Sequence, residues 1–285
     1  MSSEVVAIPM ESAQSDRQAA NLTGVPETML WTLHNRACEA RRQDGILIDP
    51  TAVRIYDSLL YDYERSFGPA DASHAIRSVI FDREVASFLH RHPDGTVVNL
   101  AEGLETQRFR VPHGEALWIS VDLPEGIAIR ERFIAPDDRH IHLGMSALDR
   151  GWFDAVPADK PVYITAQGLL MYFQPAEVEA LVRDMAAAFP GGSFAFDYIP
   201  RWLARKTLRG WHRTPHYRTP PMPWGINRDE VMPTLAAWCG AGADLKDLPW
   251  HFPRGALRWF APLCLTLPPV ARHCPGSLRV RFPDA

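Results

Sequence analysis

The chain is expected to fold as an α/β protein built around a mostly parallel sheet of seven strands, with helices on both faces. Two features of residues 96–200 lead to this prediction. Short apolar runs rich in β-branched and aromatic residues recur there, and most are separated by segments whose apolar residues follow a helical period. Strands that are buried on both faces read as continuous apolar runs, and alternation with helices is typical of parallel sheets.

The 285 residues are expected to form a short tail and one domain. Residues 1–20 are small and polar without periodicity, so we expect them to be a disordered tail. The domain over residues 21–285 has four parts by composition: a helical cover, a strand-bearing core that binds the cofactor, a lid or substrate segment, and a final part that completes the sheet. These parts are residues 21–95, 96–200, 201–228 and 229–285.

The helical cover contains three expected helices. The first spans residues 27–42, where apolar residues recur every three or four positions. Asp49 and Pro50 start the second, because Asp accepts hydrogen bonds from free amides at a helix start and Pro suits the first helical position. Ser73 is expected to cap the third.

Five strands are expected in the core, and most of them end in small or polar residues. The runs are residues 97–100, 118–121, 141–143, 162–166 and 194–196. In an open parallel sheet, ligands bind at the carboxyl ends of the strands. We therefore expect the residues that follow these runs to face one crevice.

The last two parts of the chain show weaker signals. Prolines and aromatic residues between Trp211 and Trp224 exclude a regular helix or a central strand, so this stretch is either a surface loop or a lid over the substrate. Asn227 is expected to cap another helix. Residues 277–282 alternate in the manner of an edge strand.

Composition excludes several classes of function. The net charge of −4 argues against a nucleic-acid partner. The longest apolar run, residues 260–271, is short and interrupted by prolines, so no membrane partner is expected. Four cysteines without a CxxC pair predict reduced thiols and a cytoplasmic protein. No metal is expected, because His140 and His142 lack a third ligand and a proline interrupts the stretch from His212 to His216.

The turn after the first strand carries the strongest chemical signal. Residues 100–103 lie between a strand and a helix, where a nucleotide-type cofactor binds, and Asp122 ends the next strand, where it can accept from a ribose hydroxyl pair. Thr106 stands where a dinucleotide fingerprint has its third glycine. Glu102 and Glu105 would repel a pyrophosphate and attract a cationic sulfonium. A nicotinamide oxidoreductase remains an alternative at this point.

Four ordered motifs resemble the leucine carboxyl methyltransferase family, and more closely its bacterial tetracenomycin-type O-methyltransferase branch. They are residues 97–107 (VVNLAEGLETQ), 120–125 (SVDLPE), 146–149 (SALD) and 165–172 (TAQGLLMY). The resemblance implies a Rossmann-like class I methyltransferase fold with S-adenosylmethionine as the cofactor. It also implies O-methylation of a carboxylate or phenol on a small, polyketide-like molecule.

The resemblance further assigns the cofactor contacts. Asp122 would accept from both ribose hydroxyls, and Arg77 or Arg36 would bind the carboxylate of the methionine portion. The full set of cofactor-binding residues expected is Arg36, Arg77, Leu100, Ala101, Gly103, Asp122, Leu123, Ser146, Ala147, Leu148, Gln167 and Gly168. Two positions depart from the family. Ala101 replaces a Gly, which preserves the turn if its φ is negative, and Gln167 replaces a Glu, which removes a charge.

The acceptor site is expected on the rim formed after the fourth and fifth strands. Its expected residues are Tyr172, Trp211, His216, Tyr217 and Trp224, whose aromatic rings suit an apolar small molecule. A phenol would benefit from a base, for which His212, His216 and Asp197 are the candidates, whereas a carboxylate needs none. The sequence leaves open the oligomeric state, and it leaves open a protein that binds the cofactor without transferring its methyl group.

Overall fold

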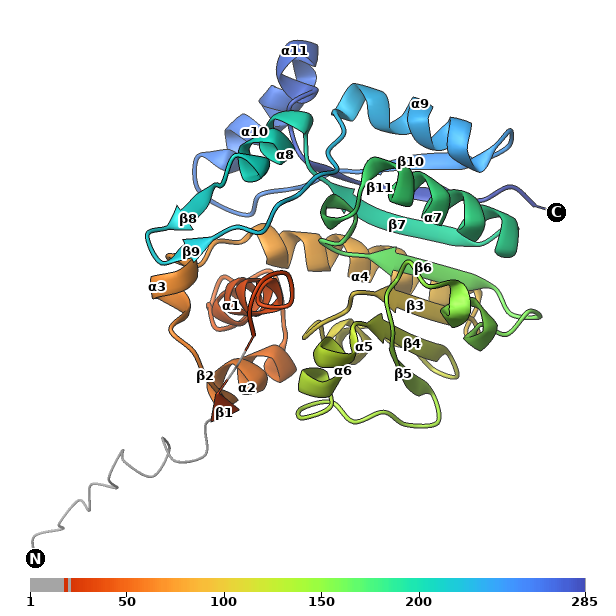
Figure 1. Cartoon of the computed structure of the whole chain (residues 1–285), viewed down its shortest axis with the longest axis horizontal. Coiled ribbons are helices and arrows are strands. Elements are labelled where there is room, and N and C mark those ends of the chain that lie inside the picture. Colours follow the sequence, from red (N-terminus) through yellow and green to blue (C-terminus); the bar gives the residue numbers. More distant parts are fainter. Residues whose placement is uncertain (1–17, 20–21, 285) are drawn as a thin grey trace, which may run out of the picture.

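The sheet forms where the apolar runs predict it in the computed structural model, which describes residues 18–19 and 22–284. Seven strands lie in the order β10-β11-β7-β6-β3-β4-β5 (Figure 1). Their bounds are β3 Thr96–Leu100, β4 Leu117–Asp122, β5 His140–Gly144, β6 Val162–Ala166, β7 Ser193–Tyr198, β10 Asp244–Leu248 and β11 Gly276–Arg281. Strands β3 to β7 pair in parallel, and only β11 runs antiparallel to its neighbours β7 and β10. The predicted Rossmann-like α/β class is confirmed.

Helices cover both faces of this sheet. Their bounds are α1 Thr28–Ala40, α2 Pro50–Ser58, α3 Tyr63–Phe67, α4 Ser73–Arg91, α5 Gln107–Arg110, α6 Pro124–Arg130, α7 Pro175–Ala188, α8 Arg201–Leu208, α9 Arg228–Cys239, α10 Leu257–Thr266 and α11 Pro268–Ala271, with 3₁₀ turns η1 Arg150–Ala155 and η2 Leu170–Tyr172. Two short strand pairs lie outside the sheet: β1 Gln18–Ala19 with β2 Leu59–Leu60, and β8 His212–Thr214 with β9 Tyr217–Arg218.

The strand residues divide between two apolar layers. Val97 and Tyr163 pack on the side of α4, whereas their neighbours Val98 and Ile164 pack on the side of α7 and α9. This division follows from the pleat, because successive side chains of a strand point to opposite faces. Both faces are buried, which explains why β3 and β6 have no polar alternation.

The amino-terminal helices form a third cluster beside the carboxyl ends of the strands. Leu30 and Leu33 of α1 pack with Phe67 and Leu104, so the cover is joined to the loop that follows β3. Asp49 accepts a hydrogen bond from the backbone of Ala52 and so caps α2 as predicted.

Three predictions at element boundaries are corrected. Residues 18–19 of the expected tail form β1, and the remainder of that tail lies outside the described residues. Ser73 begins α4 but does not cap it; the backbone N–H of Ser73 donates to Asp71. The strand expected at residues 277–282 is not an edge, because β10 lies outside it. No helix in the described part of the chain combines the length and the hydropathy needed to cross a bilayer.

Candidate functional site

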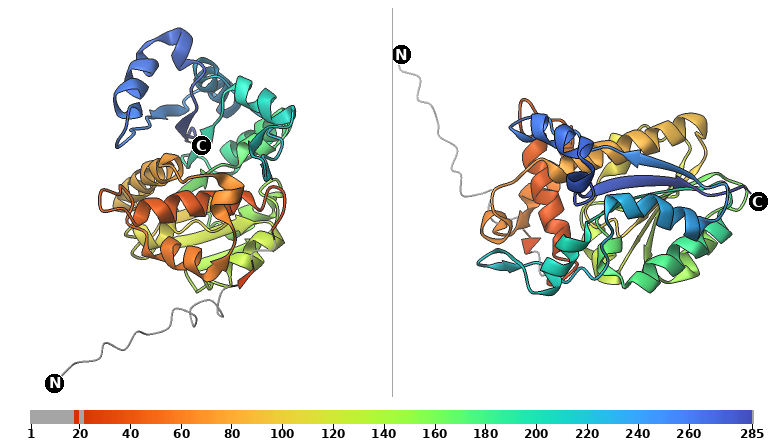
Figure 2. Two further views of the ribbon diagram at one scale, coloured as in Figure 1. Left: turned by 90° about the vertical axis from the view of Figure 1, so that its left-hand side faces the viewer. Right: turned by 90° about the horizontal axis from the view of Figure 1, so that it is seen from above.

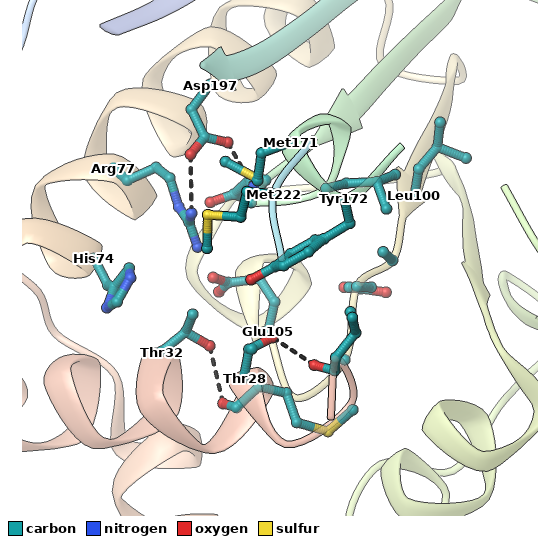
Figure 3. A pocket seen from close by; sticks show the side chains of 18 of the residues that line it. Thr28, Thr32, His74, Arg77, Leu100, Glu105, Met171, Tyr172, Asp197 and Met222 are labelled. Carbon is teal, nitrogen blue, oxygen red and sulfur yellow. Dashed lines mark hydrogen bonds and ion pairs between the residues drawn. The ribbon is translucent and has the colours of Figure 1, made fainter. Parts of the chain in front are cut away.

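A cavity of about 600 Å³ opens at the carboxyl ends of the parallel strands. Its walls come from the ends of β3, β4, β5, β6 and β7, from the starts of α1 and α4, and from side chains of the later segments (Figure 3). The predicted cofactor residues that border it are Arg77, Leu100, Ala101, Gly103, Asp122, Leu123, Ser146, Ala147, Gln167 and Gly168. The strand-end rule therefore brings ten residues from four strand ends and one helix to a single hollow.

The turn after β3 is held in a left-handed conformation at two positions. Gly103 has a φ of 53° and Ala101 has a φ of 52°. The condition of a negative φ at Ala101 is therefore not met, and the Cβ of Ala101 is held where a glycine would be favoured. A Cβ on Gly103 would lie 3.0 Å from the Cβ of Met29 on α1, so the cover approaches this turn closely.

Asp122 ends β4 at the same edge. Its Oδ2 accepts from the backbone N–H of Gly103 at 2.7 Å, and its Oδ1 accepts from the N–H of Leu123 at 2.7 Å. A Cβ at Gly126 would lie 2.7 Å from Oδ1, so only glycine leaves room for this carboxylate. Burial raises the pKa of Asp122 to about 6, and the two backbone hydrogen bonds oppose that rise.

The two glutamates of the β3 loop are neutralised by buried arginines. Glu102 accepts from Asn99 Nδ2 at 3.0 Å and forms an ion pair with Arg130 at 3.1 Å. Burial would raise the pKa of Glu105, but Arg110 and Arg36 hold it well below its usual range. Both carboxylates border the cavity but are already paired inside the protein, so their attraction for a cationic sulfonium is weaker than that of unpaired charges.

Arg36 lies in that buried network and not on the cavity wall. Its guanidinium donates to Asp49, Glu105, Thr106 and the carbonyl oxygen of Leu104. Its side chain is 1% exposed. The network joins α1 to the cap of α2 and to the loop after β3. Both terminal nitrogens of Arg36 donate within it, and the buried Nε has no partner among the described residues.

Arg77, in contrast, borders the cavity from α4. Its NH1 forms an ion pair with Asp197 Oδ2 at 3.1 Å, and Asp197 Oδ1 accepts from the N–H of Gly168 at 2.5 Å (Figure 3). A Cβ at Gly168 would lie 2.8 Å from NH1. Gly168 is therefore the residue that lets Arg77 reach across the end of β6. Asp197 borders the same cavity, and its carboxylate already accepts from two donors.

The expected adenine loop contributes unevenly. Ser146 and Ala147 border the cavity, whereas Leu148 does not and packs against the main core. Ser146 Oγ accepts from the N–H of Leu148 at 3.2 Å, which fixes the turn.

The expected acceptor residues separate into two groups. Tyr172 and Trp211 border the cavity, and burial raises the pKa of Tyr172 to about 12. Tyr217 lies in the amino-terminal cluster with its ring 4.8 Å from that of Phe67. Trp224 is 4% exposed and belongs to the main core.

The histidines of the same segment, His212 and His216, are exposed on the β8–β9 hairpin and do not border the cavity. The hairpin is directed elsewhere because Arg213 Nε donates to the carbonyl oxygen of Phe67, and Thr214 Oγ1 bonds the end of α3. Neither histidine is placed to remove a proton from a molecule in the cavity. In the described part of the chain, no group of His, Cys, Asp or Glu is arranged to hold a metal.

Part of the cavity wall comes from elements far from the strand ends in the sequence, and no sequence pattern predicts it. Trp31 and Thr32 of α1, His74 of α4 and Trp250 after β10 all border the cavity. His74 lies one helical turn before Arg77, and its ring meets that of Trp31 edge-on at 5.3 Å. The only local signal for His74 is this helical spacing from Arg77.

His74 is held as a neutral hydrogen-bond donor. Asn35 Oδ1 accepts from the N–H of Asp71, and Asn35 Nδ2 donates to Asp71 Oδ1, so the orientation of the amide is fixed. The same Nδ2 lies 3.0 Å from His74 Nδ1, which must then accept and leave the proton on Nε2. Burial, followed by the charges of Arg77 and other arginines, lowers the pKa of His74 well below its usual value.

Comparisons of this sequence with known proteins identify its family. A sequence model of the leucine carboxyl methyltransferase family matches residues 29–186. The tetracenomycin polyketide synthesis O-methyltransferase TcmP of Streptomyces glaucescens is 34% identical over 194 residues, which are 66% of this chain and 71% of that protein. The S-adenosyl-L-methionine-dependent methyltransferase dpfgK of Gibberella zeae is 29% identical over 229 residues, or 70% of this chain and 77% of its own. The crystal structure of the methyltransferase SibL in its apo form aligns with a TM-score of 0.47 at 13% identity, over 73% of this chain and 56% of that one.

Proposed function

The chain belongs to the leucine carboxyl methyltransferase family of S-adenosylmethionine-dependent methyltransferases, and from this premise we propose that it methylates a carboxylate oxygen on a small, largely apolar molecule. A nicotinamide oxidoreductase no longer competes, because the family's motifs account for the same strand-end residues. The single observation that carries the choice of a carboxylate is the fixed tautomer of His74.

The cavity suits the cofactor in both size and chemistry. Its volume of about 600 Å³ lies within the usual range for small-molecule sites. Asp122 would hold the ribose hydroxyls, Ser146 and Ala147 would border the adenine, and Arg77 would bind the methionine carboxylate. Gln167 Oε1 is buried and has no hydrogen-bond partner in the described ranges, so it is a free acceptor for the ammonium group.

The residues of the chain would then position the cofactor and the acceptor for the reaction. When bound, S-adenosylmethionine supplies a methyl group on a cationic sulfur, which is the electrophile of the reaction. Trp31, Trp211 and Trp250 give the acceptor space its apolar walls and exclude water from it. His74 Nε2–H has no partner among the described residues and is available to donate to an oxygen of the acceptor.

The absence of a placed base favours a carboxylate over a phenol. A carboxylic acid is ionised at neutral pH, whereas a phenol with a pKa of about 10 must lose its proton first. His74 has no free lone pair, Asp197 already accepts from Arg77 and Gly168, and the exposed hairpin carries His212 and His216 away. The Nε2–H of His74, close to the positive charge of Arg77, would stabilise an acceptor carboxylate that is already ionised when it binds.

The test measures cofactor binding and acceptor methylation separately. Calorimetry with S-adenosylmethionine and S-adenosylhomocysteine measures the first, and transfer of a labelled methyl group to 2-naphthoate or to 2-naphthol measures the second. We expect both cofactor forms to bind and naphthoate alone to be methylated. His74→Gln keeps an N–H donor and should retain turnover, whereas His74→Phe should lose it at unchanged cofactor affinity.

Methylation of naphthol in preference to naphthoate would show that the acceptor is a phenol. Binding of cofactor without transfer to any carboxylate would favour a protein that has lost the reaction. We also propose a reducing, cytoplasmic setting, which is supported by all four cysteines being free thiols.

A further inference from the structure

The segment between β10 and β11 carries an uncovered apolar surface. No residue from 249 to 275 is buried, although this stretch contains both α10 and α11. Its exposed apolar side chains are Leu257, Trp259, Phe260, Leu263, Leu267 and Val270. Trp259 is 72% exposed, and Figure 2 shows the two helices standing out from the rest of the molecule. A patch of this composition marks a surface that meets another apolar phase.

The helix α8 extends this surface. Trp202 Nε1 donates to the carbonyl oxygen of His273 at 2.9 Å, which joins α8 to the end of α11. Trp202 is 48% exposed and Leu208 is 54% exposed. We call the exposed apolar residues of α8, α10 and α11 the apolar shelf.

The shelf lies among basic residues and away from acidic ones along the chain. Residues 198–228 contain seven Arg or Lys and neither Asp nor Glu, and residues 249–275 contain three Arg and again no acid. The whole chain has a net charge of −4, so this is a strong local excess. Some of these cations pair with acids of other segments, but five exposed ones form no ion pair among the described residues. They are Arg205, Lys206, Arg209, Arg218 and Arg258.

The shelf is continuous with the wall of the cavity. Trp250 and Pro275, at the two ends of the excursion that contains α10 and α11, both border the cavity. On α8, the ammonium group of Lys206 lies 4.3 Å from the centre of the Trp211 ring, which is also part of the wall. A surface bound to the shelf therefore lies beside the acceptor space.

We infer that the apolar shelf docks on the surface of an anionic lipid bilayer, with α10 and α11 at the level of the headgroups. Tryptophan, phenylalanine and leucine beside arginine and lysine are the composition of helices that lie in a membrane interface. The anionic headgroups of such a bilayer match the free cations around the shelf. This is a surface mode of binding, so it does not require the spanning helix that the described residues lack.

Other occupants fit less well. A second copy that met this one through the same shelf would bring two basic borders together, which opposes association. An acidic protein would match the basic residues around the shelf. A flat protein surface would cover only one side of residues 249–275, however, and all 27 of these residues lack burial. A bilayer surrounds whatever is inserted into it. An apolar acceptor dissolved in the bilayer would also leave it next to Trp250 and Trp211.

The test is flotation of the full-length protein with vesicles of known composition. We expect binding to vesicles of equal parts phosphatidylglycerol and phosphatidylcholine, and at least tenfold weaker binding to phosphatidylcholine alone. Binding should fall in about 0.5 M salt, where the screening length is about 4 Å. Trp259→Ser with Phe260→Ser should weaken binding at least tenfold, and Arg205→Gln with Arg209→Gln should weaken it in low salt. None of these four residues borders the cavity, so cofactor affinity should be unchanged.

The control variants remove exposed apolar or basic side chains that lie outside the shelf. Ile48 is 86% exposed outside the shelf, so Ile48→Ser should bind vesicles like the parent protein. Arg139→Gln with Arg183→Gln removes two exposed arginines from other elements and should also leave vesicle binding unchanged. If the Trp259 and Phe260 variant lowers the melting temperature, quenching of the parent protein's tryptophans by brominated lipid supplies the same answer without a substitution.

Three results would overturn the inference. The first is absence of binding to anionic vesicles, or binding that the shelf variants leave unchanged. The second is quenching by brominated lipid that is absent in the parent protein. The third is a dimer in analytical ultracentrifugation that the Trp259 and Phe260 variant dissociates, which would show that a second copy covers the shelf. Methyl transfer is measured in none of these experiments, so their failure leaves the proposed reaction untouched.

Discussion

Cofactor affinity is predicted to depend on pH through Asp122. Its carboxyl has a pKa of about 6 in the free protein because burial disfavours the charge. Ribose hydroxyls donate to a carboxylate, so binding favours the ionised form and should be strongest above that pKa. At pH 5 about one tenth of the groups are ionised, and the dissociation constant should be about tenfold higher than at pH 7.

The sign for stability is the opposite. A carboxyl whose pKa is raised in the folded state adds stability below its unfolded pKa of about 3.9, and that contribution is lost as the pH rises through 6. The free protein should therefore lose this contribution to stability over the same range in which it gains affinity.

Calorimetry with S-adenosylhomocysteine between pH 5 and pH 7 measures the effect, with Asp122→Asn as the control. The amide has no charge to titrate, so its affinity should be flat with pH and at least tenfold weaker at pH 7, since each charge-assisted hydrogen bond contributes about 1.5 to 3 kcal/mol. A parent protein whose affinity does not change with pH would refute the argument from burial. A pH dependence that persists in the Asn variant would assign it to another group.

Three further substitutions test the roles of single residues. Ala101→Gly should raise the free energy of unfolding in urea by about 1 kcal/mol, because Ala101 has a φ of 52°; a loss of stability would show that its Cβ makes a contact worth more than the strain. Trp224→Ala should cost about 3 to 5 kcal/mol because the ring lies in the core, whereas Trp211→Ala should keep the melting temperature and lose acceptor turnover; equal losses of stability would remove Trp211 from the acceptor wall. Arg36→Met should lower the free energy of unfolding by about 3 to 5 kcal/mol, because Asp49 and Glu105 stay buried with fewer partners. The folded variant should keep its affinity for the cofactor. Weakened cofactor binding at unchanged stability would show that Arg36 contacts the cofactor.

The central strands were predictable because burial on both faces leaves a simple trace in the sequence. Strand β6 has five buried residues in succession and was found without difficulty. Strand β10 reads Asp-Leu-Lys-Asp-Leu, and its sequence does not predict a strand because an exposed edge needs no apolar run. Strand β11 alternates like an edge strand, but its polar face is covered by hydrogen bonds and ion pairs: Ser277 Oγ accepts from Trp250, and Arg279 pairs with Asp244.

Site residues can be predicted from the sequence where the end of a strand fixes their position. They cannot be predicted where the packing of distant elements fixes it. Asp122 borders the cavity because it ends the parallel strand β4, and Gly168 does so because it follows β6. His74 and Trp31 reach it only because α4 and α1 pack across the strand ends, which no local pattern specifies. Trp224 illustrates the opposite error. Its position in an aromatic, proline-rich segment indicated a cavity wall, and the chain instead returns it to the core.

The net charge of the chain hides how its charges are distributed. Inside the protein, Arg36 and Arg110 pair with Glu105, and Arg130 pairs with Glu102, so the acids near the β3 loop are balanced by neighbouring arginines. All the acidic residues lie outside residues 198–228, a range whose formally charged side chains are arginines and a lysine. A net charge of −4 predicts no nucleic-acid partner, but a net charge says nothing about a local basic border. Around the apolar shelf, the local excess of positive charge, and not the net charge of the chain, favours binding to an anionic bilayer.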